Sequence, residues 1–143
     1  MNTDDGPAQR LLQTRANESD VRLSPDGRSM IYTSDASGRG EVYLARFPEA
    51  QGSRVLSSGG GYRPMWRRDG GEVYYLAPDN RLMAVRMTGG SPLPTPSAPS
   101  LLFQTPLFNG LYVPSPDGQR FLVATPAAST DVVAMEVVVN ALR

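Results

Sequence analysis

The chain has 143 residues, 40% of them hydrophobic, which suits one domain with a buried core. Its 14 acidic and 14 basic residues give a net charge of zero. This balance argues against a nucleic-acid-binding surface, because such surfaces carry a basic excess. Cysteine, histidine and lysine are absent. Their absence excludes disulfides and thiolate metal sites, and it removes the commonest general base.

No run of about 18 apolar residues is present, so the sequence predicts no membrane span. The first seven residues lack the basic and apolar segments of a signal peptide. As written, the sequence therefore predicts a cytoplasmic protein. An extracytoplasmic location would follow if the chain belongs to a longer, membrane-anchored protein.

In chain order, residues 1–9 are polar and predict a disordered N-terminus, and residues 10–14 predict a short strand. Three similar units follow. The first (20–57) predicts strands at 21–24, 29–34, 41–47 and 53–57. The second (62–103) predicts strands at 62–66, 72–77, 81–87 and 100–103, with an irregular proline-rich connection at 89–100. The third (111–140) predicts strands near 111–114, at 119–124 and at 131–140. No segment shows a helical period.

An Asp-Gly pair between apolar runs marks a hairpin in each unit, and the three aspartates are 43 and then 48 residues apart. The six turn residues are Asp26, Gly27, Asp69, Gly70, Asp117 and Gly118. Asp-Gly predicts a type I′ turn, in which both central residues have positive φ. A repeat of this length with four short strands is typical of a β-propeller blade. The sequence therefore predicts an all-β partial β-propeller of about three four-stranded antiparallel blades, spanning 10–143.

The chain follows the pattern x-Pro-x-Trp-Ser-Pro-Asp-Gly, then an apolar strand ending in Tyr-x-Ser, then Gly-x-x-x-Val-Tyr, although its second unit has Arg67-Arg68 in place of Ser-Pro. This pattern resembles the TolB-type, WD-like propeller repeat. NESDVRLSPDGRSMIYTSDASGRGEVYLARFP (17–48), SPDGQRFLVATP (115–126) and VVVNALR (137–143) resemble, more narrowly, the last blades of propellers linked to bacterial serine/threonine kinases. The resemblance implies a sensor or scaffold module. The signatures of a kinase domain itself are absent from the chain.

Propellers typically have four to eight blades, so a three-blade arc predicts open edges. Residues 10–14 match the outer strand of a preceding blade, and the last unit lacks an outer strand. Two copies could therefore form a homodimer through their open blade edges, with 10–14 of one chain beside 132–140 of the other.

The most distinctive candidate site consists of Tyr62, Arg63, Arg67 and Arg68, which lie close to Trp66. Arginine pairs with carboxylates and phosphates in bidentate geometry, so these residues could form a rim patch for a ligand or an acidic partner. The alternative interpretation is a solvated turn, because exposed charges contribute little. Trp66 and Tyr112 predict packing between blades.

No catalytic chemistry is predicted. Ser24 and Ser115 precede prolines, but no histidine or lysine is available to activate them. The Gly59-Gly60-Gly61 run lacks the P-loop ending and predicts an inter-blade link. The sequence therefore predicts a non-enzymatic module without cofactor or metal, which binds a protein partner or small ligand. The alternatives are the gating propeller of a prolyl-oligopeptidase-type peptidase and a self-associating half-propeller.

Overall fold

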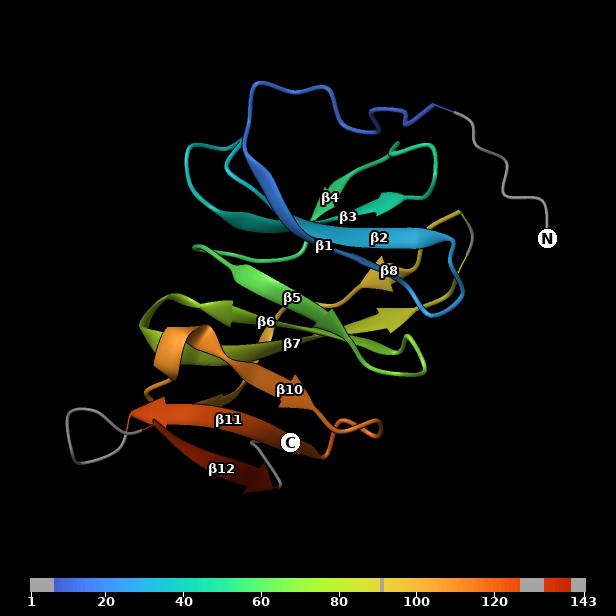
Figure 1. The fold of residues 1–143 in the computed structure, drawn as a ribbon. Coiled ribbons are helices and arrows are strands. Elements are labelled where there is room, and N and C mark those ends of the chain that lie inside the picture. The colour runs from blue at the N-terminus through green and yellow to red at the C-terminus, as the bar shows by residue number, and fades with distance from the viewer. Residues whose placement is uncertain (1–6, 91, 127–132, 140–143) are drawn as a thin grey trace.

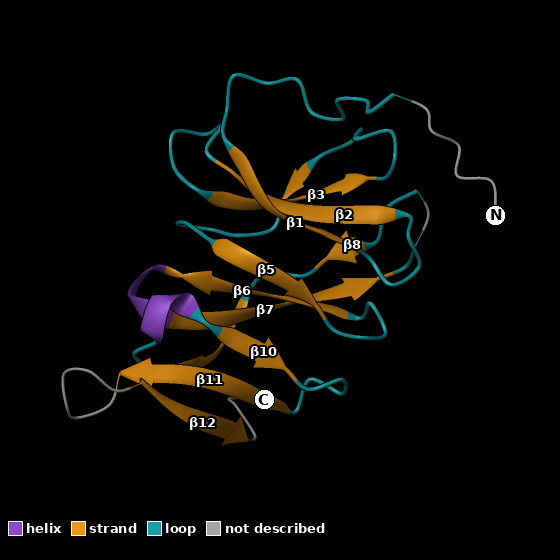
Figure 2. Cartoon of the chain, viewed as in Figure 1, coloured by secondary structure: helices purple, strands orange, loops and turns teal. Residues whose placement is uncertain are grey.

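The computed structural model describes residues 7–90, 92–126 and 133–139, which form three antiparallel sheets stacked side by side (Figure 1). We call these sheets blades 1, 2 and 3. The only helical segments in the described ranges are two short 3₁₀ turns, Pro78–Asn80 and Phe108–Gly110 (Figure 2). The predicted class, an all-β partial β-propeller, is confirmed.

In blades 1 and 3 the strands follow one another in sequence across the sheet; in blade 2 the first four strands do so, and the fifth also pairs with the third. Blade 1 contains β1 (Glu18–Leu23), β2 (Ser29–Ser34), β3 (Glu41–Arg46) and β4 (Arg54–Val55). Blade 2 contains β5 (Tyr62–Trp66), β6 (Glu72–Ala77), β7 (Arg81–Thr88), β8 (Thr95–Pro96) and β9 (Ser100–Gln104). Blade 3 contains β10 (Tyr112–Pro114), β11 (Arg120–Pro126) and β12 (Val133–Val139).

The burial pattern of the second strand of each blade depends on whether one or both faces of that strand are covered. Strands β2 and β6 are buried along their whole length, because both of their faces are covered. Strand β11 alternates instead: Phe121 and Val123 are buried, whereas Leu122 is exposed. A period of two indicates a strand with one covered face and one open face. Blade 3 therefore presents an open face.

Blade 2 differs from the predicted four-stranded sheet because it has five strands. The connection 89–100 was expected to contain no strand, yet Thr95–Pro96 forms β8. Strand β7 is eight residues long and serves two partners. Its C-terminal end pairs with β8, and its N-terminal half pairs with β9. The proline of β8 is tolerated because β8 lies at a sheet edge.

The strand predicted at 10–14 is wrong, because these residues form no strand. Leu12 instead packs against Met30, Tyr32 and Ala45 on the face of blade 1 that points away from blade 2. In Figure 1 this N-terminal segment passes over blade 1. The two leucines of this segment resemble the apolar residues of a strand. Leu12 covers an apolar face of blade 1 through its side chain alone, without the backbone hydrogen bonds of a sheet.

Two hydrophobic cores join the three blades. The first combines Ile31, Val42 and Leu44 of blade 1 with Val73 and Tyr75 of blade 2, among others. The second core packs residues of blade 2 against residues of blade 3: Tyr74, Leu76, Leu82, Tyr112, Phe121 and Val123. The rings of Tyr74 and Phe121 meet edge to face at 5.1 Å. Each blade thus depends on its neighbour for burial, as expected for stacked repeats.

Several expectations fall wholly or partly outside the described residues. They are the disorder at 1–6, most of the loop at 126–131, and the two ends of the strand predicted at 131–140. In the described ranges, no helix is long and apolar enough to cross a membrane.

Candidate functional site

The three Asp-Gly turns connect the first and second strands of their blades. In blade 1, Gly27 N–H donates to the Ser24 carbonyl and Ser24 N–H donates to the Ser29 carbonyl, both at 2.9 Å. Only the glycine is left-handed, at φ +73°, whereas Asp26 does not have positive φ. The type I′ prediction is therefore wrong. Pro25 fixes its own φ near −65°, which suits the second position of a type I turn, and the left-handed glycine follows Asp26.

The turn carboxylates are bound within their own turns. Asp26 Oδ1 accepts from Ser24 Oγ at 2.6 Å and from Arg28 N–H at 3.0 Å. Asp117 Oδ1 accepts in the same way from Ser115 Oγ at 2.7 Å and Gln119 N–H at 2.9 Å. These hydrogen bonds hold the pKa of both carboxyl groups below the ordinary aspartate value.

In blade 2, Arg67 takes the place of the turn serine. Its guanidinium donates to Asp69 from Nε at 2.7 Å and from Nη2 at 3.0 Å, and its Nη1 lies 3.4 Å from the nearly buried Glu72 carboxylate. Hydrogen bonding to Arg67 lowers the pKa of the Asp69 carboxyl. Arg67 is thus committed to its own hairpin. Arg68 is exposed, and no hydrogen bond or ion pair between described residues involves its side chain.

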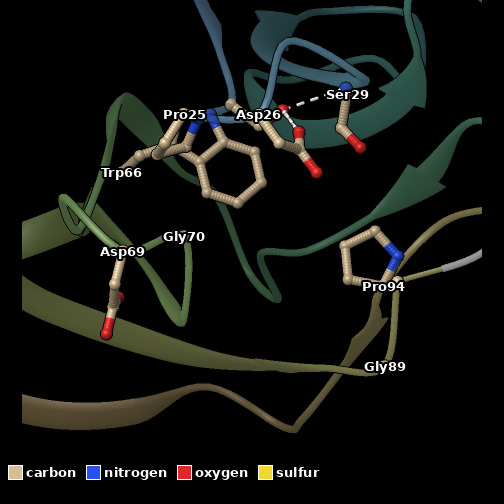
Figure 3. Close-up of a pocket in the computed structure, with 10 residues that line it drawn as sticks. Pro25, Asp26, Ser29, Trp66, Asp69, Gly70, Gly89 and Pro94 are labelled. Carbon is tan, nitrogen blue, oxygen red and sulfur yellow. Dashed lines mark hydrogen bonds between the residues drawn. The ribbon is translucent and has the colours of Figure 1, made fainter.

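A cavity of about 140 Å³ lies between the turns of blades 1 and 2, and Figure 3 shows its lining. The Trp66 ring lies beside Asp26, while the Asp69 carboxylate is directed away from the ring. Trp66 Nε1 donates to the Arg22 carbonyl at 3.4 Å, and the ring packs against the core between these blades. The predicted inter-blade packing of Trp66 is confirmed. With Asp26 held in its own turn, this cavity is mainly a packing feature.

A second cleft, of about 220 Å³, lies along the first strands of the blades. Strands β1, β5 and β10 follow one another on the same side of the arc (Figure 1). We call this feature the inner cleft. The residues lining it are Asp20, Arg22, Arg63, Pro64, Met65, Gly110, Leu111, Tyr112 and Val113. Charged groups from blades 1 and 2 here meet an apolar wall from blades 2 and 3.

Asp20 and Arg63 occupy equivalent strained positions in this cleft. Each is left-handed, at φ +54° and +52°, and each lies where a bulge interrupts the pairing of its strand. They are 43 residues apart, and Arg63 N–H points to Asp20 Oδ2 at 3.4 Å. A left-handed residue other than glycine costs about 1–2 kcal/mol. Such strain tends to gather at functional sites.

Tyr112 ties blade 3 to this arrangement. Its hydroxyl donates a short hydrogen bond to the Arg63 carbonyl, and its side chain belongs to the core between blades 2 and 3. Its predicted inter-blade packing is confirmed. Burial raises the pKa of Tyr112 far above the ordinary tyrosine value, while the positive charges of Arg22 and Arg63 oppose that rise. The hydroxyl therefore stays protonated and remains a donor.

The structure divides the four predicted patch residues between two places. Tyr62 and Arg63 lie at the start of β5, where both approach Gly110. A Cβ on Gly110 would lie 3.3 Å from Arg63 Nε and from Tyr62 Cε2. Arg67 and Arg68 belong to the turn at the other end of the strand. The expected single patch of Tyr62, Arg63, Arg67 and Arg68 is therefore not formed.

Sequence reasoning missed the cleft roles of Asp20 and Arg22. A signal was present, since Asp20 precedes Asp26 by the same six positions that separate Arg63 from Asp69. The six-residue offset links the two bulged positions. In the described part of the chain, no group of three or more His, Cys, Asp or Glu residues could hold a metal ion.

No protein-family model matches this sequence, and no curated protein matches it at the sequence level. Solved structures do resemble the fold. TolB from Acinetobacter baumannii aligns with a TM-score of 0.63 and 17% identity over 87% of this chain and 30% of its own. An oligogalacturonate lyase from Vibrio parahaemolyticus gives 0.64 and 17% over 80% of this chain and 31% of its own.

The β-propeller domain of Swd1 from Myceliophteria thermophila aligns with a TM-score of 0.61 and 14% identity, over 88% of this chain and 38% of that chain. The chain thus spans about a third of the length of the structures that it resembles. Identities this low show the fold alone, a TolB-like and WD-like propeller arc.

Proposed function

We propose that this chain is a non-catalytic β-propeller module that binds a carboxylate group of a protein partner or small acid in the inner cleft. The observation that carries the proposal is the meeting of Arg22 and Arg63 beside the apolar wall of Met65, Leu111 and Val113. Neither guanidinium forms an ion pair with another described residue. Arginine is the side chain best suited to bidentate carboxylate binding.

The size of the inner cleft limits what fits. Its volume of about 220 Å³ is below the usual range for drug-sized ligands, about 300–1,000 Å³. One acidic side chain or a small dicarboxylic acid is the appropriate scale. Asp20 also lies in the cleft, so a ligand that donates a hydrogen bond beside its carboxylate is favoured over a bare anion.

The non-catalytic part of the proposal draws support from composition. The chain has no histidine, cysteine or lysine, so the commonest nucleophile–base pairs are unavailable to it. By its sequence resemblance to kinase-linked propellers, we further propose that the module serves as sensor or scaffold in a bacterial signalling protein.

The test is an NMR titration of the ¹⁵N-labelled chain with N-acetyl-L-glutamate α-amide, which carries one carboxylate, with N-acetyl-L-glutamine α-amide as the uncharged control. We expect saturable shifts of the amide signals of Arg63, Gly110 and Tyr112 with glutamate only. Arg63→Asn should weaken binding at least tenfold, because asparagine tolerates the left-handed backbone but lacks the charge. Arg68→Asn is the matched control and should bind normally. Equal shifts with the glutamine derivative, or unchanged binding by Arg63→Asn, would refute the proposal.

A further inference from the structure

The three blades place chemically different side chains at the same position of the inner cleft. The residues six positions before the aspartates of the three turns are Asp20, Arg63 and Leu111. All three line the inner cleft. They lie in or next to the first strands β1, β5 and β10, which follow one another on the same side of the arc (Figure 1). The cleft thus receives an acid, a base and an apolar side chain from three successive blades.

The Asp20 carboxylate has capacity for a further hydrogen-bond donor. Its Oδ2 accepts from Arg63 N–H and from Thr33 Oγ1, both at the long distance of 3.4 Å. Its Oδ1 accepts no hydrogen bond from another described residue, and this carboxylate belongs to no ion pair in the described ranges. An ionised carboxylate has about four acceptor sites. Asp20 can therefore accept from a cationic group of a ligand.

The Arg63 guanidinium is the matching group of opposite charge. Its side chain forms no hydrogen bond or ion pair with another described residue. Its backbone, in contrast, is held on both sides, because its N–H points to Asp20 and its carbonyl accepts from the Tyr112 hydroxyl. The second arginine of the cleft, Arg22, donates from Nη1 to the Val21 carbonyl at 3.0 Å. Arg63 is therefore the guanidinium that is free for a bidentate carboxylate contact.

The acid and the base of the cleft lie close together. Since Asp20 Oδ2 contacts Arg63 N–H, the carboxylate lies against the backbone from which the guanidinium extends. An ammonium and a carboxylate that are attached to the same carbon atom have a comparably short separation. A bare anion on Arg63 would lie beside the like charge of Asp20, which is unfavourable. An ammonium group on the ligand turns this repulsion into an attraction.

We propose that the inner cleft binds a free aliphatic α-amino acid. Its ammonium group pairs with Asp20, its carboxylate pairs with Arg63, and its side chain packs against the apolar wall. The wall selects an aliphatic side chain, because the burial of apolar surface is favourable. This inference rests on the proposed function, since it requires that the cleft binds a carboxylate, and it adds the class of ligand.

The experiment is an NMR titration of the ¹⁵N-labelled chain at about pH 6, where the amines of the ligands are protonated. It compares L-leucine with N-acetyl-L-leucine, which lacks the ammonium group, and with L-leucinamide, which lacks the carboxylate. We expect L-leucine to bind at least about tenfold more tightly than either, the usual effect of a charge-assisted hydrogen bond. L-Asparagine, a polar counterpart of similar shape, should bind several-fold more weakly than L-leucine.

The possible failures are distinguishable. Equal affinities for L-leucine and N-acetyl-L-leucine would overturn the inference and leave carboxylate binding in place. Equal affinities for L-leucine and L-leucinamide would overturn both proposals, and equal affinities for L-leucine and L-asparagine would overturn the aliphatic preference. If L-leucine does not bind, the inference fails alone when the N-acetyl-L-glutamate derivative still binds, and together with the proposed function when it does not.

A variant of Asp20 tests the contact with the ammonium group. Asp20→Asn removes the negative charge but keeps an oxygen acceptor and a residue that tolerates the left-handed backbone. It should weaken L-leucine binding at least about tenfold and leave N-acetyl-L-leucine binding unchanged or tighter. Asp79→Asn is the matched control and should bind both ligands normally, because Asp79 is an exposed left-handed aspartate, at φ +65°, that does not line the cleft. Unchanged L-leucine binding by Asp20→Asn, or an equal loss for both ligands, would overturn the inference.

Discussion

Single residues in the turns determine how closely neighbouring blades approach. Gly118 of blade 3 lies against blade 2, where a Cβ would sit 2.0 Å from the Tyr74 hydroxyl and 3.0 Å from Arg67 Cδ. Tyr74 is fully buried and cannot swing away. Gly27 has the same left-handed backbone, but nothing lies within 4 Å of the position of its missing Cβ. An alanine at Gly27 would therefore introduce backbone strain alone, whereas an alanine at Gly118 would introduce the same strain and a steric overlap.

We expect Gly27→Ala to lower the free energy of unfolding by about 1–2 kcal/mol, the cost of a left-handed alanine. Gly118→Ala adds the overlap with Tyr74 and should cost about 2–5 kcal/mol in total, since overpacking typically adds 1–3 kcal/mol. Urea unfolding followed by circular dichroism measures both. Equal losses for the two variants would mean that blade 3 shifts freely relative to blade 2.

At the scale of elements, the N-terminal segment is the least regular part and yet contributes to burial. Leu12 is half-buried against Met30 and Tyr32, whereas the adjacent Leu11 is 42% exposed. Sequence periodicity treats these two leucines alike. Only their position on blade 1 distinguishes them.

Truncation of the two leucines should therefore have unequal effects. Leu12→Ala is expected to lower the free energy of unfolding by about 1–2 kcal/mol, less than the 2–5 kcal/mol of a fully buried leucine. Leu11→Ala should change it by less than about 0.5 kcal/mol, as for most surface positions. Thermal unfolding compares the two. A similar loss for both would contradict the packing of Leu12 on blade 1.

At the scale of the whole molecule, the two shared cores predict that the blades unfold together. Trp66 is the single tryptophan and lies in blade 2 against blade 1, so its fluorescence reports on blade 2 and on its contact with blade 1. Phe121 is fully buried in blade 3, and it contacts Tyr74 of blade 2 and Phe103 of β9. A loss of packing in blade 3 should therefore also lower the stability of blade 2, which Trp66 fluorescence detects.

Phe121→Ala should destabilise the chain by about 3–5 kcal/mol, the usual cost of deleting a buried phenylalanine. The midpoints of urea unfolding from Trp66 fluorescence and from circular dichroism should shift together, because each blade lacks a core of its own. Leu101→Ala, at an exposed position of β9, is the control and should leave both midpoints in place. Separate midpoints in Phe121→Ala would show that blade 3 unfolds independently.

The local sequence determined the strands and the turns of this protein. Apolar-rich runs next to the Asp-Gly pairs predicted strands 29–34, 62–66 and 72–77 with their observed bounds, because these signals act over a few residues. The predicted turn type was wrong because the aspartate of each pair does not have positive φ, and in Ser24-Pro25-Asp26-Gly27 the proline favours this other turn by setting its own φ.

Tertiary structure alone decided the site and the ends of the arc. Arg63 and Arg67 are four residues apart, yet one faces the inner cleft with Asp20 and the other is bound to Asp69. A bulge with a left-handed residue separates them, and spacing along the chain cannot show that a bulge will form. Likewise, Leu12 and Leu122 belong to similar apolar runs. Leu12 covers an apolar face of blade 1, whereas Leu122 is exposed on a face of blade 3. The difference arises because burial depends on which surfaces meet in space.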